Sequence, residues 1–430
     1  MISETLLGGS TLLPSRKRRE VVAKKVALVS ATSVLGGGEL YGTTLMAALD
    51  PARYRPVVIC PPTGDLPDLL RTHGLRTLPL VLPDRISGAA RASFSFGPRS
   101  LVPTVLATSE AAVAAVAVLR HSRAHLVHIN SIKAGFFAAP VARALGLPVV
   151  WDFKDLVTPD HYSPKLRRVV VTYLNLFATH VIANSGAIRA ELVRAGVREA
   201  KVVALHNGID LARFMPALAD DSRARVRTEL RLAPNVPVAV IVGRLAPWKG
   251  HEVFIQAATR VHATLPQACF LVVGDSAFDP PEYRERLVRM ASEGGLGTAL
   301  RFMGFRDDVP AVMGAADVVV HCSILPEPLG LTPIEAMALG RPVIAAAAGG
   351  PLETVADGKT GLLTPMGDID ALVVALLRLF ADAHLRAHMG AAGRERAERM
   401  FDLKENARAV MDVYDAALAN QNGHSIDGTR

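Results

Sequence analysis

The stretch "VAVIVGRLAPWKGHEVFIQAATRVHATLPQACFLVVGDS", Val238–Ser276, decides the fold. It begins with an apolar run that lacks polar alternation, which is typical of a strand covered on both faces of a sheet. The loop "APWKG" separates this run from an amphipathic, helix-like segment, and a second apolar run, "ACFLVVGDS", follows. The order strand, helix, strand indicates a parallel β-α-β unit.

The same alternation recurs along the chain. "VALVS" (Val26–Ser30) precedes a glycine-containing loop and a helix-like run, and the strand-like segments "LVHINS", "LPVVWDFKD" and "HVIANS" come later. The pattern pauses at "LARFMPALADDSRARVRTELRLAPNVP", which is charged and proline-containing, and then resumes. Because 430 residues exceed what one core holds, we predict two Rossmann-like, doubly wound parallel-sheet domains over residues 25–211 and 212–405. Ligands of such sheets bind beyond the carboxyl ends of the strands and between domains.

The two ends of the chain differ from these domains. Residues 1–24 contain "RKRRE" and lack the apolar core of a secretory signal, so we predict a flexible basic leader. Residues 406–430 are predicted to form a C-terminal helix and a disordered tail. No apolar run reaches the ~18 residues of a membrane span, and "VLATSEAAVAAVAVL", which carries Glu110, reads as a packed helix.

Charge is unevenly distributed in a chain of soluble, globular composition. Residues 1–205 hold 25 Lys and Arg against 13 Asp and Glu, whereas residues 206–430 hold 23 against 27. The basic first half indicates either an anionic partner or a solvated basic face. The segment "SPKLRRVVVTYLNLF" fits an interfacial helix on an anionic membrane or a packed helix with a basic end. Aromatic residues are only 5% of the chain and no nucleic-acid motif appears, so we expect no nucleic-acid partner.

Three cysteines stand far apart, without the spacing of a metal site. We expect buried, reduced thiols in a cytosolic protein.

Polar side chains cluster at strand ends of the second half. Arg244 and Lys249 follow one strand, Gly274 follows the next, and Glu327 and Glu335 follow a third. Two cations beside the N–H groups of a helix start suit a diphosphate, whereas carboxylates accept hydrogen bonds from sugar hydroxyls. Each residue alone would be an ordinary surface charge or helix cap, but the combination indicates a site for a nucleotide-activated sugar.

The motifs around these residues resemble glycosyltransferase family 4, the retaining group with the GT-B fold. The family's Glu-x7-Glu pattern, followed by Ala-Met-Ala-x-Gly-x-Pro-Val, stands here as "EPLGLTPIEAMALGRPV". "GRLAPWKG", "HNGIDLARF" and "AGGPLETVADGKTGLL" match further family segments. The resemblance runs from about Lys25 to Tyr414.

The resemblance implies roles for individual residues on the donor side. Glu327 would contact the donor sugar, Glu335 the ribose, and Arg244 and Lys249 the diphosphate. Glu327, Arg244 and Lys249 are therefore the predicted catalytic residues. Further nucleotide contacts are implied for Gly330, Leu331, Thr332, Gly274, Phe305 and Arg306.

On the acceptor side, "GGGE" matches the family's glycine loop before the first helix, which implies contacts from Gly37 and Gly38. Many relatives have His-x-His where this chain has His128 and Asn130. That departure leaves open whether His128 reaches the acceptor or lies in the core, while Asn130 and Lys133 stay acceptor-side candidates.

The resemblance implies a retaining transferase that moves a sugar from a UDP- or GDP-sugar to an acceptor hydroxyl. The acceptor would be a glycan or a lipid-linked molecule of cell-envelope, polysaccharide or glycolipid synthesis. We expect no cofactor and no metal, and a cytoplasmic location that can include the inner face of the membrane. Two alternatives are a GT-B-fold sugar-nucleotide epimerase and a non-catalytic partner subunit of an active transferase.

Overall fold

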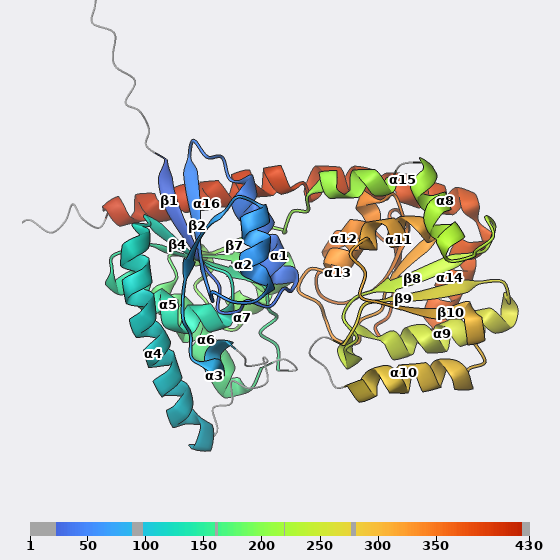
Figure 1. Ribbon diagram of the computed structural model, residues 1–430, viewed down its shortest axis with the longest axis horizontal. Helices are drawn as coiled ribbons and strands as arrows, with labels where there is room; N and C mark the ends of the chain where they lie inside the picture. Colours follow the sequence, from blue (N-terminus) through green and yellow to red (C-terminus); the bar gives the residue numbers. More distant parts are fainter. Residues whose placement is uncertain (1–22, 88–97, 160–161, 219, 277–280, 424–430) are drawn as a thin grey trace, which may run out of the picture.

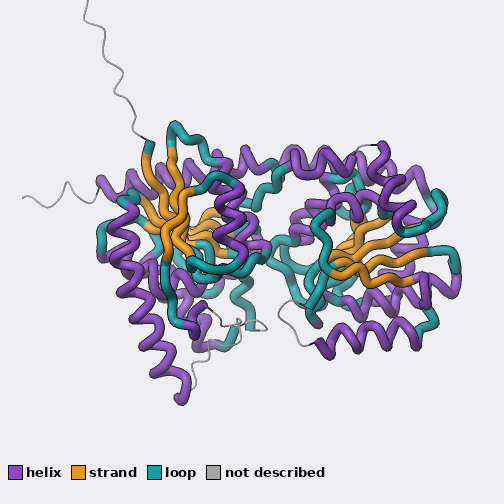
Figure 2. Tube along the Cα trace, viewed as in Figure 1, coloured by secondary structure: helices purple, strands orange, loops and turns teal. Residues whose placement is uncertain are grey.

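The computed structural model consists of two α/β domains that lie side by side (Figure 1). Strands occupy the centre of each domain and helices surround them (Figure 2). The structure describes residues 23–87, 98–159, 162–218, 220–276 and 281–423. The predicted leader up to residue 22 and the predicted tail from residue 424 lie outside these ranges.

The first domain is built on a parallel sheet of seven strands in the order β3-β2-β1-β4-β5-β6-β7. Its strands are β1 (Lys24–Val29), β2 (Tyr54–Cys60), β3 (Arg76–Pro79), β4 (Leu126–Ile129), β5 (Val149–Phe153), β6 (His180–Ala183) and β7 (Val202–Ala204). Its helices are α1 (Gly37–Ala48), α2 (Asp65–Thr72), α3 (Asp84–Ser87), α4 (Pro98–Ser122), α5 (Ile132–Ala144), α6 (Pro164–Phe177), α7 (Gly186–Arg194) and the 3-10 turn η2 (Glu199–Lys201).

The second domain has a parallel sheet of six strands in the order β10-β9-β8-β11-β12-β13. Its strands are β8 (Val238–Val242), β9 (Cys269–Val273), β10 (Leu300–Gly304), β11 (Val318–His321), β12 (Val343–Ala346) and β13 (Gly361–Thr364). Its α-helices are α8 (Asp220–Glu229), α9 (His251–Thr264), α10 (Pro281–Glu293), α11 (Val309–Ala315), α12 (Leu331–Ala338), α13 (Pro351–Thr354), α14 (Ile369–Ala381) and α15 (Ala383–Met400). Its 3-10 turns are η3 (Leu211–Leu218), η4 (Pro247–Lys249) and η5 (Gly297–Ala299). Both sheets reverse their strand order beside their first strand, so the predicted doubly wound fold class is confirmed.

Both faces of the first sheet are buried, as the apolar strands predict. Along β1, Ala27 and Val29 join one core and Val26 and Leu28 join the other. In the first of these cores a Cβ atom added at Gly135 of α5 would lie 1.7 Å from the Trp151 ring of β5. Only glycine therefore lets α5 approach the sheet so closely, and this contact fixes the first turn of α5 against β5.

The last helix, α16 (Leu403–Gly423), belongs to the core of the first domain although it follows the second. It continues the line of α15 along one side of the molecule (Figure 1). Val410 and Tyr414 are fully buried against the first sheet, and the Tyr41 hydroxyl donates to Asn406 over 2.8 Å. The sequence predicted this helix but not its place, because no local pattern says which domain an apolar face covers.

Helix α4 packs only one of its faces. Ala107, Ala111, Ala115 and Leu119 are buried, while Val102, Val105, Leu106 and Val113 are exposed. The part Val102–Ser122 is long and apolar enough, by length and composition, to cross a membrane, and 28% of the apolar window is buried. The same test is passed by core helices of soluble proteins, and α4 lies against α5 in the first domain.

Candidate active site

The carboxylate of Glu327 is the centre of a polar cluster at the carboxyl end of the second sheet. It lies in the loop after β11 and is buried. Its Oε1 accepts hydrogen bonds from Lys249 Nζ at 2.6 Å and from the Ser323 hydroxyl at 2.5 Å. His321 Nε2, at the end of β11, lies 3.2 Å from the same oxygen. Lys249 comes from η4 after β8, so two strand ends that the sequence predicted to meet are brought together.

The electrostatics of this cluster keep Glu327 ionised. Burial on its own raises the pKa of Glu327, but the nearby His321 and Lys249 outweigh burial and hold the pKa below its usual range. The Lys249 ammonium also lies 4.3 Å from the centre of the Trp248 ring, a cation–π contact that helps to fix it. A charged acceptor and a charged donor therefore stand side by side at neutral pH.

A pair of glycines sets the position of the Glu327 loop. Glu327 forms an isolated parallel bridge with Gly349, and its carbonyl accepts from the Gly350 N–H at 2.8 Å. A Cβ atom at Gly349 would lie 2.3 Å from the Glu327 carbonyl oxygen, and one at Gly350 would lie 2.3 Å from the Leu329 Cα. The two backbones can approach this closely only because both positions lack a side chain.

Two helix starts, one from each domain, face each other beside this loop. Helix α12 begins after Gly330, whose φ is 80° and which has no side chain to cap the helix; within the described residues no other side chain accepts from the first N–H groups of α12. Helix α1 likewise begins after a glycine, Gly36. A Cβ atom built on Gly37 would lie 3.6 Å from Leu331 Cδ1. Uncapped N–H groups at a helix start, with Leu331 and Thr332 in the first turn of α12, suit an anionic ligand.

Glu335 lies on α12, in surroundings that contrast with those of Glu327. Burial raises the pKa of Glu335, and the charge of Arg213 in η3 opposes that rise. Within the described part of the chain, the Glu335 carboxylate takes part in no hydrogen bond or ion pair. A partly buried carboxylate without a donor favours a ligand that brings hydroxyl donors to it.

The loop after β8 holds Arg244 against the next strand end. Gly274 follows β9 with a φ of 133°, and a Cβ atom there would lie 2.0 Å from the Gly243 carbonyl oxygen. The Leu245 N–H donates to the Asp275 carbonyl at 3.1 Å. Gly274 thus shapes the loop that carries the half-buried Arg244, which is a structural role that the sequence pattern did not specify.

The two residues predicted near the base differ in their surroundings. Phe305 is 75% exposed after β10, which leaves its ring available to stack on a ligand. Arg306 instead forms ion pairs with Asp308 at 2.7 Å and Glu229 at 2.8 Å. Its charge is therefore already matched within the protein.

On the first domain, Asn130 connects the glycine loop to a buried charge cluster. Its Nδ2 donates to the Gly38 carbonyl at 3.2 Å, and its Oδ1 accepts from Lys154 Nζ at 2.7 Å. Lys154 also pairs with the buried Asp152 at 2.5 Å. Lys133 lies half-buried in the first turn of α5, whose start is capped by the Ser131 hydroxyl. Gly38 and Lys133 thus lie in the first turns of α1 and α5, and Asn130 lies directly after β4, at the carboxyl end of the first sheet.

His128 lies in the core instead of on the acceptor side. Its ring is fully buried, its Nδ1 is 2.8 Å from the Tyr414 hydroxyl of α16, and its Nε2 is 3.6 Å from Asp152. Burial lowers the pKa of His128, with Asp152 acting in the opposite direction. The core position was one of the two alternatives that the sequence left open, and the structure favours it over the acceptor contact, because the alternation of side chains along β4 places this ring on the sheet face that α16 covers.

Sequence reasoning missed Glu353, which joins the two domains. Its carboxylate, on α13 of the second domain, accepts from the Gly186 N–H at 2.7 Å and the Ala187 N–H at 2.6 Å, at the start of α7 in the first. His206 Nε2 lies 2.9 Å from the same carboxylate. Burial raises the pKa of Glu353, but these partners outweigh it and lower the pKa. The segment "AGGPLETVADGKTGLL" contained the residue, but only the fold shows which helix start it meets.

Metal ligands do not gather at this site. Within the described residues, no group of three or more His, Cys, Asp or Glu side chains is placed to hold a metal ion. The polar groups that line the site are suited instead to the hydroxyls and phosphates of an organic ligand.

Comparison with known proteins assigns the family. The model for "Glycosyl transferases group 1" matches residues 222–396, and that for "Glycosyl transferase 4-like domain" matches residues 36–208. A D-inositol 3-phosphate glycosyltransferase of Streptomyces scabiei (strain 87.22) is 31% identical over 310 residues, which cover 70% of this chain and 68% of the relative. The chain belongs to the glycosyl transferases group 1 family.

One further relative and one solved structure define the extent of the similarity. A D-inositol 3-phosphate glycosyltransferase of Salinispora tropica is 34% identical over 274 residues, and this chain spans 56% of its length. The crystal structure of Anabaena Alr3699/HepE in complex with UDP and glucose matches with a TM-score of 0.79 and 28% identity, over 91% of this chain and 99% of that one. The two facing parallel-sheet domains are therefore a GT-B fold.

Proposed function

We propose that this protein is a retaining glycosyltransferase that moves a sugar from a nucleotide-diphosphate sugar to an acceptor hydroxyl. The observation that carries the proposal is the Lys249–Glu327 pair, 2.6 Å apart, in a loop that leads into the uncapped start of α12. A nucleotide-diphosphate sugar matches the carboxylate, the cation and the helix start. Its sugar hydroxyls would bind Glu327, and its phosphates would bind Lys249 and the first N–H groups of α12.

Each residue then has a distinct task. The ionised Glu327 accepts hydrogen bonds from the donor sugar and orients it. Lys249 and Arg244 neutralise the negative charge that develops on the diphosphate as its bond to the sugar breaks. Glu335 accepts from the ribose hydroxyls, which supply the donors that it lacks.

The transfer step itself needs no further group from the protein. The bond between the anomeric carbon and the phosphate oxygen breaks, and the acceptor oxygen bonds to that carbon from the same face. The acceptor's hydroxyl proton passes to the departing phosphate oxygen. The anomeric configuration is kept because both events occur on one face of the sugar. Contact between the two domains excludes water from this space and limits hydrolysis of the donor.

The related Anabaena structure supports UDP as the nucleotide, with GDP as the alternative to test. The acceptor is proposed to bind the first domain near Gly38, Asn130 and Lys133, where its hydroxyl would face the donor across the cleft. A glycan or lipid-linked acceptor of envelope synthesis fits this cleft and the basic first domain. We place the enzyme in the cytoplasm, where nucleotide sugars are available, with peripheral membrane contact as part of the proposal.

A thermal-shift panel with UDP, GDP, ADP and their common sugar conjugates, without added metal, tests the donor class. A ligand that binds only the folded state must raise the melting temperature, and we expect a rise selective for uridine. The identified donor is then incubated with candidate acceptors, and proton NMR of the new linkage reports its configuration. An inverted product contradicts retention, and a new sugar nucleotide formed without acceptor supports the epimerase instead.

A further inference from the structure

A second polar cavity lies in the second domain, away from the donor loops. Its volume is about 220 Å³, and its lining includes Arg223, Arg341, Arg386 and Asp317. Asp317 immediately precedes β11 and Arg341 precedes β12, so the cavity lies at the amino ends of these parallel strands. The Glu327 loop follows their carboxyl ends. The cavity and the candidate active site are therefore at opposite edges of one sheet.

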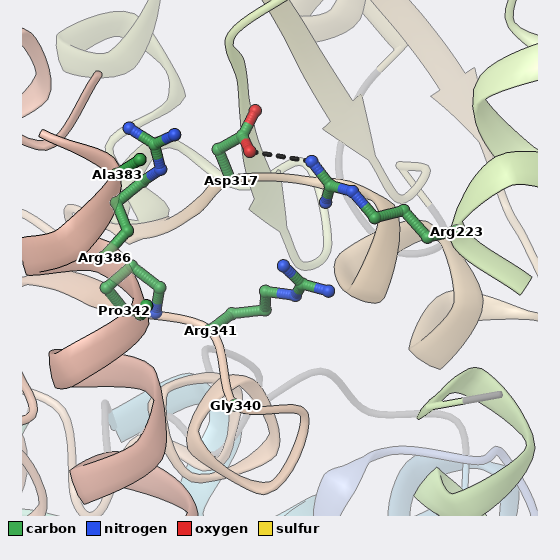
Figure 3. Close-up of a pocket in the computed structure, with 8 residues that line it drawn as sticks. Arg223, Asp317, Gly340, Arg341, Pro342, Ala383 and Arg386 are labelled. Atoms are coloured by element: carbon green, nitrogen blue, oxygen red, sulfur yellow. Dashed lines mark hydrogen bonds and ion pairs between the residues drawn. The ribbon is translucent and has the colours of Figure 1, made fainter. Parts of the chain in front are cut away.

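Three guanidinium groups share this cavity with a single carboxylate. Figure 3 shows that the four charged side chains come from separate elements and surround one space. Arg223, from α8, pairs with Asp317 at 2.7 Å and also donates to the carbonyls of residues 314, 315 and 316. Arg386, from α15, donates through one nitrogen to the Leu379 and Phe380 carbonyls at the end of α14. Positive charge thus exceeds negative charge among the lining side chains.

Arg341 is the residue that the protein itself leaves unsatisfied. Within the described residues, its guanidinium takes part in no hydrogen bond or ion pair, and its Nε is buried without a partner. Burial lowers the pKa of Arg341 to about 10, with Arg223 acting in the same direction and Asp317 against it. A guanidinium whose Nε is buried without an acceptor is unfavourable, because that N–H group has lost water and gained nothing in exchange. An acceptor that enters the cavity removes this penalty.

We propose that this cavity binds a phosphate group. Guanidinium groups match phosphate oxygens in geometry as well as charge, and the excess positive charge of the lining calls for a dianion. The volume of about 220 Å³ accommodates a phosphate and leaves room for a small attached group. The phosphate can be free or carried by a soluble metabolite, or it can be the headgroup of a phospholipid.

The first test measures stabilisation of the full chain by inorganic phosphate. Saturating UDP is present throughout, so that the donor site does not contribute. Phosphate also stabilises proteins by exclusion from their surface, but that effect is equal in all variants and grows without saturation. We compare wild type with Arg341→Gln, Arg341→Lys and the matched control Arg378→Gln, which removes an exposed arginine from α14.

The expected result is a saturable rise in melting temperature in wild type and in Arg378→Gln. Arg341→Gln loses at least tenfold in apparent phosphate affinity, whereas Arg341→Lys keeps part of it because one charge remains. Arg341→Gln without phosphate melts no lower than wild type, because the removed group has no partner in the protein. This last measurement shows that the variant is folded.

A second test distinguishes the two sources of phosphate. Co-sedimentation with phosphatidylcholine vesicles, with and without phosphatidic acid, measures headgroup binding in the same variants. Binding to phosphatidic acid that Arg341→Gln loses assigns the site to a lipid, and a saturable shift with inorganic phosphate alone assigns it to a soluble ligand. The proposal is overturned if neither occurs, or if Arg341→Gln responds as wild type does.

Discussion

Glu327 and Glu335 show how the environment of a side chain decides its chemistry. Glu327 is buried and Glu335 is partly buried on the same segment. The pKa of Glu327 is lowered by His321 and Lys249, whereas burial raises the pKa of Glu335. The sequence predicted both residues from their spacing. It could not predict His321 as a partner, because this residue reaches Glu327 only through the turn that follows β11.

Replacing Glu327 by Gln keeps the shape of the side chain and removes its charge. We expect turnover to fall by about 100-fold or more, because a preorganised charged contact in the transition state is lost. Steady-state transferase kinetics measure the effect. The control is Glu252→Gln, which removes an ion pair with Arg286 on the surface of α9. Turnover within twofold of wild type in Glu327→Gln would remove this carboxylate from the mechanism.

Replacing Glu335 by Gln should raise the melting temperature of the protein and lower its affinity for UDP. Because the pKa of Glu335 is raised in the folded state, its protonated form adds to the free energy of unfolding at low pH. This contribution is lost as the pH rises and Glu335 ionises. The glutamine variant therefore unfolds at a higher temperature than wild type at neutral pH, without ligand. Its UDP affinity falls about tenfold or more, since a hydrogen bond to a charged group contributes about 1.5–3 kcal/mol. Calorimetric titration and melting curves across pH measure both, and equal UDP affinity contradicts the ribose contact.

At the scale of elements, the sequence predicted the alternation of strands and helices well because long apolar strands and amphipathic helices have distinct periods. It predicted less well which backbones touch. The contact of Gly350 with the Glu327 loop, and the burial of His128 beneath α16, join segments that are distant in the sequence. Arg306 was likewise expected at the nucleotide, and its ion pairs with Asp308 and Glu229 come from the neighbouring loop and α8.

Gly350→Ala tests the backbone contact that positions the donor loop. The added Cβ would lie 2.3 Å from the Leu329 Cα, so the loop must shift. We expect about 1–3 kcal/mol lower stability together with a tenfold or larger loss of turnover. Gly361→Ala is the control, because its Cβ would meet the Val343 carbonyl oxygen at 2.2 Å between β12 and β13. A loss of turnover per folded molecule that is equal in the two variants would show that the Gly350 contact has no particular role.

At the scale of the whole molecule, Glu353 connects the second domain to the first. Ser185 caps α7 from within the first domain. The Glu353 carboxylate accepts from two further N–H groups of α7, but from the opposite domain, so this contact must break when the domains separate. The Gly350 segment that positions Glu327 leads directly into α13. The contact between the domains and the contact that positions the Glu327 loop are therefore neighbours along the chain.

Glu353→Ala should favour the open arrangement of the domains. We expect a larger radius of gyration by small-angle X-ray scattering, turnover lowered about tenfold, and UDP affinity within twofold, because the proposed nucleotide contacts lie in the second domain. Glu353→Gln, which keeps one acceptor oxygen, recovers part of the turnover. Glu395→Ala, on the exposed face of α15, serves as the control. Unchanged scattering and kinetics in Glu353→Ala would contradict the connection.

Helix α16 has a consequence for how the chain is made. Because Val410 and Tyr414 complete the core of the first domain, that domain cannot finish folding when its own sheet leaves the ribosome. It must wait, with part of one sheet face uncovered, until the whole second domain has been synthesised. The nascent first domain is therefore a natural client for a chaperone during this interval, and the order in which the two domains mature is the reverse of the order in which they are translated.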